Sequence, residues 1–527
     1  MRITPNSTIH ILKNVPLDNS YEHTLYFYSY SSQYEYFYSR RSATKTSQSY
    51  RRHSDTSLKI DIPFDELFGC NYLMFKNTSY ENKWFYCFIT DIAYINNEIT
   101  EVFFQIDVLQ TYHFDYTLDS CFIERQHSST DTPGSNIVPE PLPIGDYEFN
   151  SDSIYVPEQM RRLAIIILST LKPDKTEGLE AKQIGGACTG LNVIAYSLSD
   201  FTAAYSWIAE INAAGKSEAI IGVYHAPLDM VSKTAQSQSS PLAVDSSPHI
   251  YTVTALKYNY DQRSPWNNWT PKNKKLYTHP FNHLYVYSPV GDNNVYPYER
   301  FPTLAKFYLM GNILPPASVQ LYPLDYNGVG QGMMNHDEGM TLSGWSQLAY
   351  STDTFKAWMA QTMLPGLVQS AASVGAAAGG GLLGFTGKVG ALKSAMSLVD
   401  NVTGMVGSGV AEYIKPPKVG GNANGTSIHT ALNDLTFIFV NRRIRLEEAK
   451  RIDDYFTRFG YAQKNLDVPN RNARSEYTYV KTIGCAVTGE IPADDAKSIS
   501  QIYDKGITWW KNPNYVGMYH KVTNIPI

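Results

Sequence analysis

The sequence predicts a mainly β protein with a few helices, an α+β fold. Tyrosine dominates the aromatic residues, with 39 Tyr against 22 Phe, while charged residues make up only 18% of the chain. Tyrosine suits the half-buried positions of a pleated sheet. Aromatic and β-branched runs also recur near both ends, at residues 84–95, 99–109 and 477–488. A chain of 527 residues is long enough for more than one domain.

The N-terminal runs predict a β-hairpin. Residues 84–95 and 99–109 are joined through Asn96-Asn97, and asparagine tolerates the positive φ of a tight turn. In the second run apolar residues alternate as far as Val108, which predicts one apolar face. Residues 21–53 are rich in Tyr and Ser and predict solvated or subunit-facing strands.

The rest of the chain alternates between buried and irregular segments. Residues 163–168 (LAIIIL) predict a buried strand. Apolar residues recur at helical spacing over residues 445–459 and end at Gly460, and Pro492 opens a last helix that stops at Gly506. The predicted organisation is two halves of one β domain, an insertion and an apolar loop. Their boundaries are 1–150 and 426–527 for the β domain, 151–345 for the insertion and 346–425 for the loop.

One segment differs from its surroundings, and we call residues 357–414 the apolar stretch. It carries no charge between Lys356 and Lys388, a length that exceeds the ~20 apolar residues needed to span a bilayer. Ala, Gly and Ser dominate it, and it contains GxxxG spacings, which allow helix backbones to approach closely in lipid. From composition alone, a buried helical hairpin, a linker and a membrane-active segment all remain open.

Composition and motifs exclude several functions. The net charge of −5 offers no basic excess for tight nucleic-acid binding. No secretory signal is expected, and five cysteines without CxxC spacing indicate reduced thiols of a cytosolic product. The GxGxxG match that begins at Gly379 lacks a preceding strand, and the P-loop hint at Gly387-Lys388 lacks the first glycine and the Ser/Thr.

A cysteine–histidine site is the remaining catalytic candidate. His113, Cys121 and His127 lie near one another in sequence, but alternation along β structure accounts for them without catalysis. No metal-ligand spacing occurs. The expected catalytic, cofactor-binding and metal residues are therefore none, and no cofactor and no enzymatic activity are expected.

Several short segments together resemble a known family. Residues 82–90 (NKWFYCFIT), 104–111 (FQIDVLQT) and 122–127 (FIERQH) resemble the N-terminal part of tail knob proteins of small short-tailed bacteriophages of Gram-positive hosts. Residues 455–461 (YFTRFGY), 477–482 (YTYVKT) and 504–509 (DKGITW) resemble the C-terminal part of the same family. The apolar stretch lies between the two groups, as it does in that family.

The resemblance implies a structural virion protein at the distal tail, made in the host cytoplasm. Its β-sandwich or barrel-like tail-tube module is expected to assemble as a ring, a homo-hexamer whose lumen double-stranded DNA crosses. Other tail proteins, namely a connector or collar and a tail-tip lysin, are expected partners. The apolar loop is expected to plug the lumen and then enter the host cytoplasmic membrane. The wall of the lumen is expected to be neutral or acidic, because phosphate-binding cations would slow DNA.

The expected plug and membrane-insertion residues share an apolar or small side chain and a place in the apolar stretch. They are Leu364, Leu367, Val368, Val374, Gly375, Gly379, Gly380, Leu382, Leu383, Gly384, Phe385, Val389, Leu392, Met396, Val399, Val402, Met405 and Val406.

Other classes of function remain as alternatives. One is a tail-tip cell-wall hydrolase, which requires a Cys–His or metal site. Another is a receptor-binding or connector tail protein without membrane activity. Deletion of the apolar stretch separates these classes, because a receptor-binding or connector protein would still assemble and function without it.

Overall fold

The computed structural model divides into two compact units. It describes residues 6–48, 57–78, 81, 83–149, 163–180, 183–184, 187–197, 201–231, 242, 249–254, 266, 269–287, 293–311, 319–330, 332–342, 347–348 and 437–527. Unit 1 is made of Met1–Pro143, Pro271–Leu276 and Glu447–Ile527, and unit 2 of Ile144–Thr270 and Tyr277–Leu446. The chain thus crosses between the units after residues 143, 270, 276 and 446, whereas the expected domain boundaries were residues 150, 345 and 425.

Unit 1 contains a six-stranded sheet of order β3-β1-β5-β6-β7-β4, a five-stranded sheet of order β2-β27-β25-β9-β24, and the pair β26-β8. Its elements are β1 (Ser7–Lys13), β2 (His23–Leu25), α1 (Tyr30–Ser39), β3 (Arg41–Gln48), β4 (Ser57–Ile60), α2 (Phe64–Leu67), β5 (Cys70–Asn77), β6 (Trp84–Tyr94), β7 (Thr100–Ile106), α3 (Val108–Thr111), β8 (Tyr116–Leu118), β9 (Cys121–Gln126), α10 (Leu446–Phe459), β24 (Tyr461–Asp467), β25 (Tyr477–Ile483), β26 (Val487–Gly489), α11 (Ala493–Lys505) and β27 (Ile507–Trp510).

The six-stranded sheet curls into a partial barrel. Its two edge strands are β3 and β4, and they approach each other at Lys45 and Asp61. The Lys45 Nζ lies 3.1 Å from Asp61 Oδ2 and donates to the Asp61 backbone oxygen at 2.9 Å. The concave side is filled by apolar side chains from all over the sheet, among them Ile9, Phe75 and Phe104, each at most 3% exposed. Burial of these side chains holds the sheet in its curled form.

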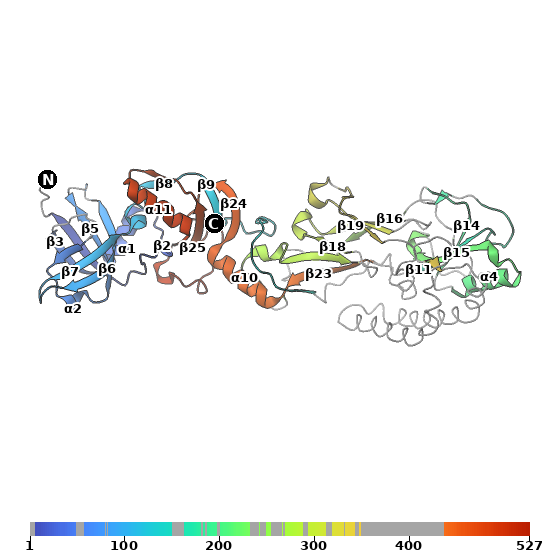
Figure 1. Cartoon of the computed structure of the whole chain (residues 1–527), viewed down its shortest axis with the longest axis horizontal. Coiled ribbons are helices and arrows are strands. Elements are labelled where there is room, and N and C mark those ends of the chain that lie inside the picture. Colours follow the sequence, from blue (N-terminus) through green and yellow to red (C-terminus); the bar gives the residue numbers. More distant parts are fainter. Residues whose placement is uncertain are drawn as a thin grey trace. The chain divides into compact units, whose positions relative to one another are not determined.

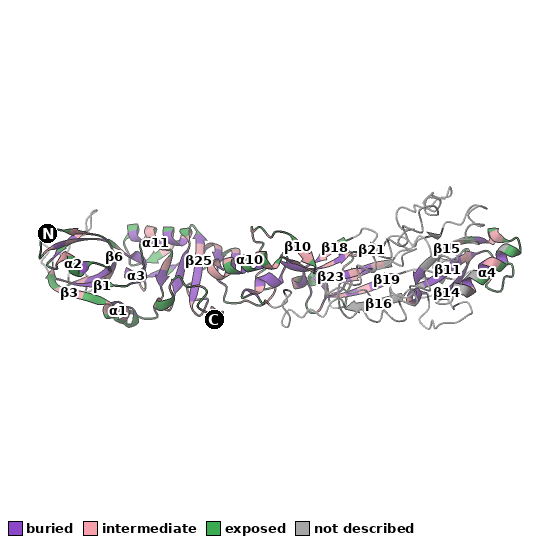
Figure 2. Ribbon diagram, turned by 90° about the horizontal axis from the view of Figure 1, so that it is seen from below, coloured by how far each residue is buried: buried purple, intermediate pink, exposed green. Residues whose placement is uncertain are grey.

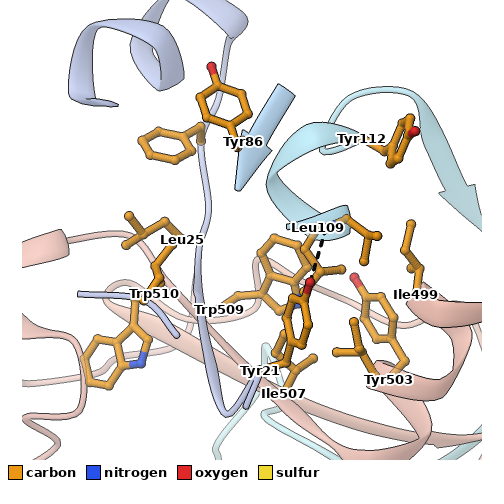
Figure 3. Packing of buried hydrophobic residues seen from close by; sticks show 14 of the residues in the cluster. Tyr21, Leu25, Tyr86, Leu109, Tyr112, Ile499, Tyr503, Ile507, Trp509 and Trp510 are labelled. Atoms are coloured by element: carbon orange, nitrogen blue, oxygen red, sulfur yellow. Dashed lines mark hydrogen bonds between the residues drawn. The ribbon is translucent and has the colours of Figure 1, made fainter. Parts of the chain in front are cut away.

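A second core joins the two ends of the chain (Figure 3). Trp509 and Tyr503 from the C-terminal part pack with Tyr21 and Leu109 from the N-terminal part. The Tyr21 hydroxyl accepts a hydrogen bond from the backbone N–H of Val108 at 3.2 Å, which keeps its polar atom satisfied inside the cluster. The chain ends therefore fold as one body, and the N-terminal strands and the red C-terminal elements lie together in Figure 1.

Both predicted C-terminal helices are confirmed. Helix α10 ends at Phe459, where Gly460 takes a φ of 64°, and a Cβ there would lie 2.3 Å from the backbone of Gln126. Only glycine fits that approach. Helix α11 ends at Gly506, with a φ of 98°, as the glycine signal predicted.

Three N-terminal expectations are corrected. Residues 30–39 form a helix, α1, because Ser29 and Ser32 make a reciprocal capping box. Strand β7 ends at Ile106 and does not reach residue 109, because the side chain of Asp107 caps α3. The turn at Asn96 uses no positive φ, since its side-chain oxygen accepts the N–H groups of residues 98 and 99.

Unit 2 contains three four-stranded sheets, of orders β10-β23-β17-β18, β14-β11-β15-β22 and β16-β19-β20-β21, and the pair β12-β13. Its helix and strands are β10 (Tyr147–Phe149), β11 (Leu163–Ser169), β12 (Gln183–Ile184), β13 (Ala187–Cys188), β14 (Asn192–Ser197), α4 (Phe201–Ala213), β15 (Ile220–Pro227), β16 (His249–Thr254), β17 (Asn282–Tyr287), β18 (Asn293–Tyr296), β19 (Lys306–Gly311), β20 (Val319–Pro323), β21 (Met340–Leu342), β22 (Gln347–Leu348) and β23 (Ile438–Ile444).

Strand β11 confirms the predicted buried strand. Ala164 and Ile166 enter the main core of unit 2, while Ile165 and Ile167 pack against Trp207 of α4 and its neighbours. Both faces are covered, which explains the unbroken apolar run. Figure 2 shows the buried character of β11 against the exposed side of α4.

Strand β23 corrects a further expectation. The segment around residues 435–440 was expected to complete the N-terminal β domain. Strand β23 instead pairs along its length with β17, and its last three residues, Arg442 to Ile444, pair with β10. Since β23 belongs to the sheet of unit 2, the C-terminal part of the chain joins unit 1 from α10 onward.

Candidate functional site

The predicted plug and membrane-insertion residues lie outside the described residues. All eighteen, from Leu364 to Val406, fall between residues 348 and 437. Among the helices that the structure describes, none is long and apolar enough to cross a bilayer. The functional features that the structure does describe are the exposed sheet edges of unit 1 and the polar cluster inside it.

Two edge strands of unit 1 are candidate contacts with other protein chains. Strand β3 is eight residues long, polar on both faces, and pairs on one side with β1. Figure 2 shows its exposed surface. Strand β24 is the edge of the five-stranded sheet, and its second half is exposed, including Leu466 at 75% exposure. Edge strands of this length present backbone donors and acceptors that another strand can pair with.

A buried ion cluster lies where a segment of the middle of the sequence rejoins unit 1. We call Glu140, Arg125 and Lys275 the Glu140 cluster. The Glu140 carboxylate, with 0% of its side chain exposed, accepts from Arg125, from Lys275 Nζ at 2.6 Å and from the backbone N–H of Ala462 at 2.9 Å. The two cations also donate to the backbone oxygens of Gly460 (2.6 Å) and Val138 (2.7 Å). Both cations thus find acceptors inside the unit, as burial requires.

The same returning segment is held by α10. Asp453 of α10 accepts from the backbone N–H of Lys272 at 3.1 Å and of Asn273 at 2.9 Å. The Asn273 side-chain amide also donates to Asp453 Oδ1 at 2.9 Å. Pro271–Leu276 is therefore anchored to unit 1 by two separate acidic residues, Asp453 and Glu140. Sequence spacing carries no signal for either contact, because the partners are more than 130 residues apart.

The Cys–His candidate is structural. His127 accepts from the backbone N–H of Tyr479 at 2.8 Å, and its other nitrogen lies 3.2 Å from the Thr457 oxygen. Burial lowers the pKa of His113 to about 4 and that of His127 to about 3, and burial raises the pKa of the Cys121 thiol. Neutral imidazoles and a protonated thiol are the opposite of the ion pair that activates a cysteine nucleophile. Among the described residues no group of three His, Cys, Asp or Glu side chains could hold a metal.

Asp107 gives unit 1 a distinct pH dependence. Its buried carboxylate accepts from the N–H groups of Leu109 and Gln110 and from the Tyr72 hydroxyl at 2.9 Å, yet burial still raises its pKa to about 7. A carboxyl with a raised folded-state pKa stabilises the fold fully below pH 4, and this contribution is lost as the pH rises towards 7.

We therefore expect Asp107→Asn to gain stability relative to the parent chain as the pH rises from 4 to 8, because the amide caps α3 without a charge. Thermal unfolding followed by the fluorescence of the buried tryptophans of unit 1 measures this difference. Tyr72→Phe removes a hydrogen-bond donor that lowers the pKa of Asp107. In this variant the loss of stability with rising pH should therefore extend to higher pH than in the parent. A constant difference between Asp107→Asn and the parent across this range would contradict the assignment.

Comparison with known proteins places these features in a class. Residues 5–117, which include the curled sheet, match a family model described as the caudoviral major tail protein N-terminus. Residues 249–524 match the model described as Bacillus phage phi29, tail knob protein gp9, C-terminal domain. The fold and these matches define a structural protein of a bacteriophage tail. The chain belongs to the family of tail knob proteins, which are located at the distal tail of the virion.

Individual relatives agree over nearly the whole chain. It is 25% identical to tail knob protein gp9 of Bacillus phage phi29 and 24% identical to that of Bacillus phage PZA, covering 97% of this chain and 98% of each relative. Its fold is similar to that in the structure of the bacteriophage C1 tail knob protein, gp12. The TM-score is 0.66 at 14% identity, over 99% of this chain and 100% of that chain. The predicted mainly β fold is confirmed.

Proposed function

We propose that this chain forms the wall of the distal tail tube, and that its apolar stretch plugs the lumen and later penetrates the host cytoplasmic membrane. The observation that carries the proposal is a 31-residue uncharged segment (residues 357–387) inside the region of residues 249–524 that matches the tail knob model. An uncharged segment tolerates transfer into hydrocarbon, where each charged residue would cost about 2.5–3.5 kcal/mol. The role is structural and requires no catalytic step.

Six copies would close the tube through the edge strands of unit 1. Strand β24 carries Leu466 on an exposed edge, where an isolated apolar side chain gains about 1.5–3 kcal/mol if a neighbouring copy buries it. Strand β3 offers a polar edge of eight residues for pairing. A closed ring removes exposed edges, because every edge then meets a neighbour.

Leu466→Asp is expected to prevent ring formation, because it places a charge in the proposed contact between copies. We expect each contact to weaken by at least about tenfold, so that the purified protein elutes as monomers where the parent forms rings. Size-exclusion chromatography with light scattering measures this.

Phe68→Asp is the matched control for ring formation. Phe68 is also 75% exposed, but it follows α2 and belongs to neither edge strand. Rings should persist in this variant. Rings in Leu466→Asp, or their loss in both variants, would contradict the proposed role of β24.

The lumen is proposed to be neutral or acidic so that double-stranded DNA passes freely. Buried Arg and Lys side chains support this, since several of them are paired with carboxylates inside unit 1. Arg125 and Lys275 share Glu140, and Arg474 lies 3.7 Å from Asp131 with both side chains almost fully buried. Cations held this way do not bind phosphates. A connector or collar and a tail-tip lysin would be the protein partners of the tube.

A further inference from the structure

Two cysteines of unit 1 lie next to each other although they are far apart in sequence. Leu118 of β8 pairs with Val487 of β26, and Phe122 of β9 pairs with Ile483 of β25. Between these pairs, the N–H of Asp119 donates to the Ala486 oxygen at 3.1 Å. These contacts hold residues 118–122 next to residues 483–487. The first segment contains Cys121 and the second contains Cys485. Here the side chains of Cys121 and Cys485 are within hydrogen-bonding reach of each other.

Both side chains point into the same core. Cys121 is 5% exposed and Cys485 is 4% exposed, and both belong to the cluster that contains Trp509. The residues beside them, Ser120, Gly484 and Ala486, are exposed. Cys121 begins β9 and Cys485 lies in the loop between β25 and β26. Both thiols are turned inward, and opening of this exposed loop is the route by which an oxidant would reach them.

The surroundings keep the pair protonated at neutral pH. Burial raises the pKa of Cys121, and burial together with the neighbouring Cys121 raises the pKa of Cys485 to about 12. The Asp504 carboxylate, which accepts the N–H groups of Gly484 and Cys485, adds to this effect. Thiolates are the reactive form, so the pair stays reduced during synthesis and reacts only when the loop opens.

We propose that Cys121 and Cys485 are a latent disulfide pair, which a small-molecule disulfide oxidises once the virion has left the reducing cytosol. One cysteine thiolate attacks the small disulfide and releases one small thiol. The second cysteine thiolate then attacks the protein sulfur of the mixed disulfide and releases the other. Two protein thiols and one small disulfide become one protein disulfide and two small thiols, with protons conserved.

The bond would link the N-terminal and C-terminal segments of unit 1 across the entire inserted part of the chain. A disulfide that closes so long a loop removes more entropy from the unfolded chain than a short-range one does. The tube domain would then become more resistant to unfolding after release. Cys70 and Cys87 provide a contrast. Cys87 pairs with Leu73, and Cys70 lies three residues from Leu73 along the strand, about 10 Å away and beyond disulfide range.

The test uses the purified full-length chain carrying Cys188→Ser, incubated with oxidised glutathione at pH 8, alkylated in denaturant and analysed by non-reducing mass spectrometry. We expect one cross-linked peptide pair, joining Cys121 to Cys485, and a Tm for unit 1 several degrees higher that dithiothreitol reverses. Cys121→Ala and Cys485→Ala should each abolish both results, whereas Cys70→Ala should change neither.

Other outcomes would overturn the proposal. These are glutathione adducts on separate cysteines without the cross-link, a cross-link that forms only after the chain has been unfolded in urea, or no oxidation at all. Each would show that the two thiols do not meet productively in the folded chain. Because the assay requires neither rings nor membranes, its failure is distinguishable from failure of the proposed function.

Discussion

Glu140→Gln is expected to lower the free energy of unfolding of unit 1 by about 3–5 kcal/mol, the range for breaking a buried ion pair from one side. The substitution leaves Arg125 and Lys275 buried without their shared carboxylate. Burial already lowers the pKa of Lys275, and Glu140 is the main group that opposes this. Without Glu140 the pKa of Lys275 falls further. The stability that the variant loses relative to the parent should therefore shrink as the pH rises towards the ordinary lysine pKa of about 10.4.

Urea unfolding followed by tryptophan fluorescence measures the loss, and Glu124→Gln is the matched control. Glu124 lies on the same strand as Arg125 and pairs with Lys481 at 2.8 Å, but both side chains are about one-third exposed. An exposed pair contributes at most about 1 kcal/mol. Equal effects of the two substitutions would show that the Glu140 cluster does not anchor the returning segment.

Leu382→Asp combined with Leu383→Asp is expected to abolish DNA delivery while leaving particles intact. Two carboxylates near the middle of the apolar stretch would cost up to about 2.5–3.5 kcal/mol each if they reached the bilayer centre, and every copy in the tail would carry both of them. Electron microscopy of the purified particles checks assembly. The efficiency of plating and the entry of viral DNA into cells should fall by several orders of magnitude.

Leu382→Ala combined with Leu383→Ala is the control for delivery. It shortens the same side chains without adding charge, so its particles should deliver DNA at a level close to the parent. Normal delivery by the charged particles would mean that the apolar stretch is only a plug or a packing segment.

The sequence predicted the elements that are determined by residues within or next to them. Helices α10 and α11 carry their glycine stops in sequence, and β11 carries an apolar run because both of its faces are covered. Helix α1 escaped prediction because its Tyr- and Ser-rich composition resembles a strand, while a two-serine capping box starts it. The early end of β7 depends likewise on a single capping residue, Asp107.

Contacts between residues far apart in sequence could not be predicted from such local patterns. Glu140 meets Lys275, and Cys121 lies beside Cys485, only because the topology returns the chain to unit 1 after long insertions. The assignment of β23 to the N-terminal domain failed for the same reason, since an alternating pattern does not say which strand will be its partner. Family resemblance identified the class of protein because it used the order of motifs along the whole chain.

Photo-cross-linking during infection tests the central claim most directly. Host cells whose cytoplasmic membrane contains photoactivatable phospholipid would be infected, irradiated during DNA entry, and analysed by mass spectrometry of this chain. We expect lipid adducts concentrated in residues 357–414 and absent from particles irradiated before adsorption. Adducts confined to the tube units, with none in residues 357–414, would contradict it.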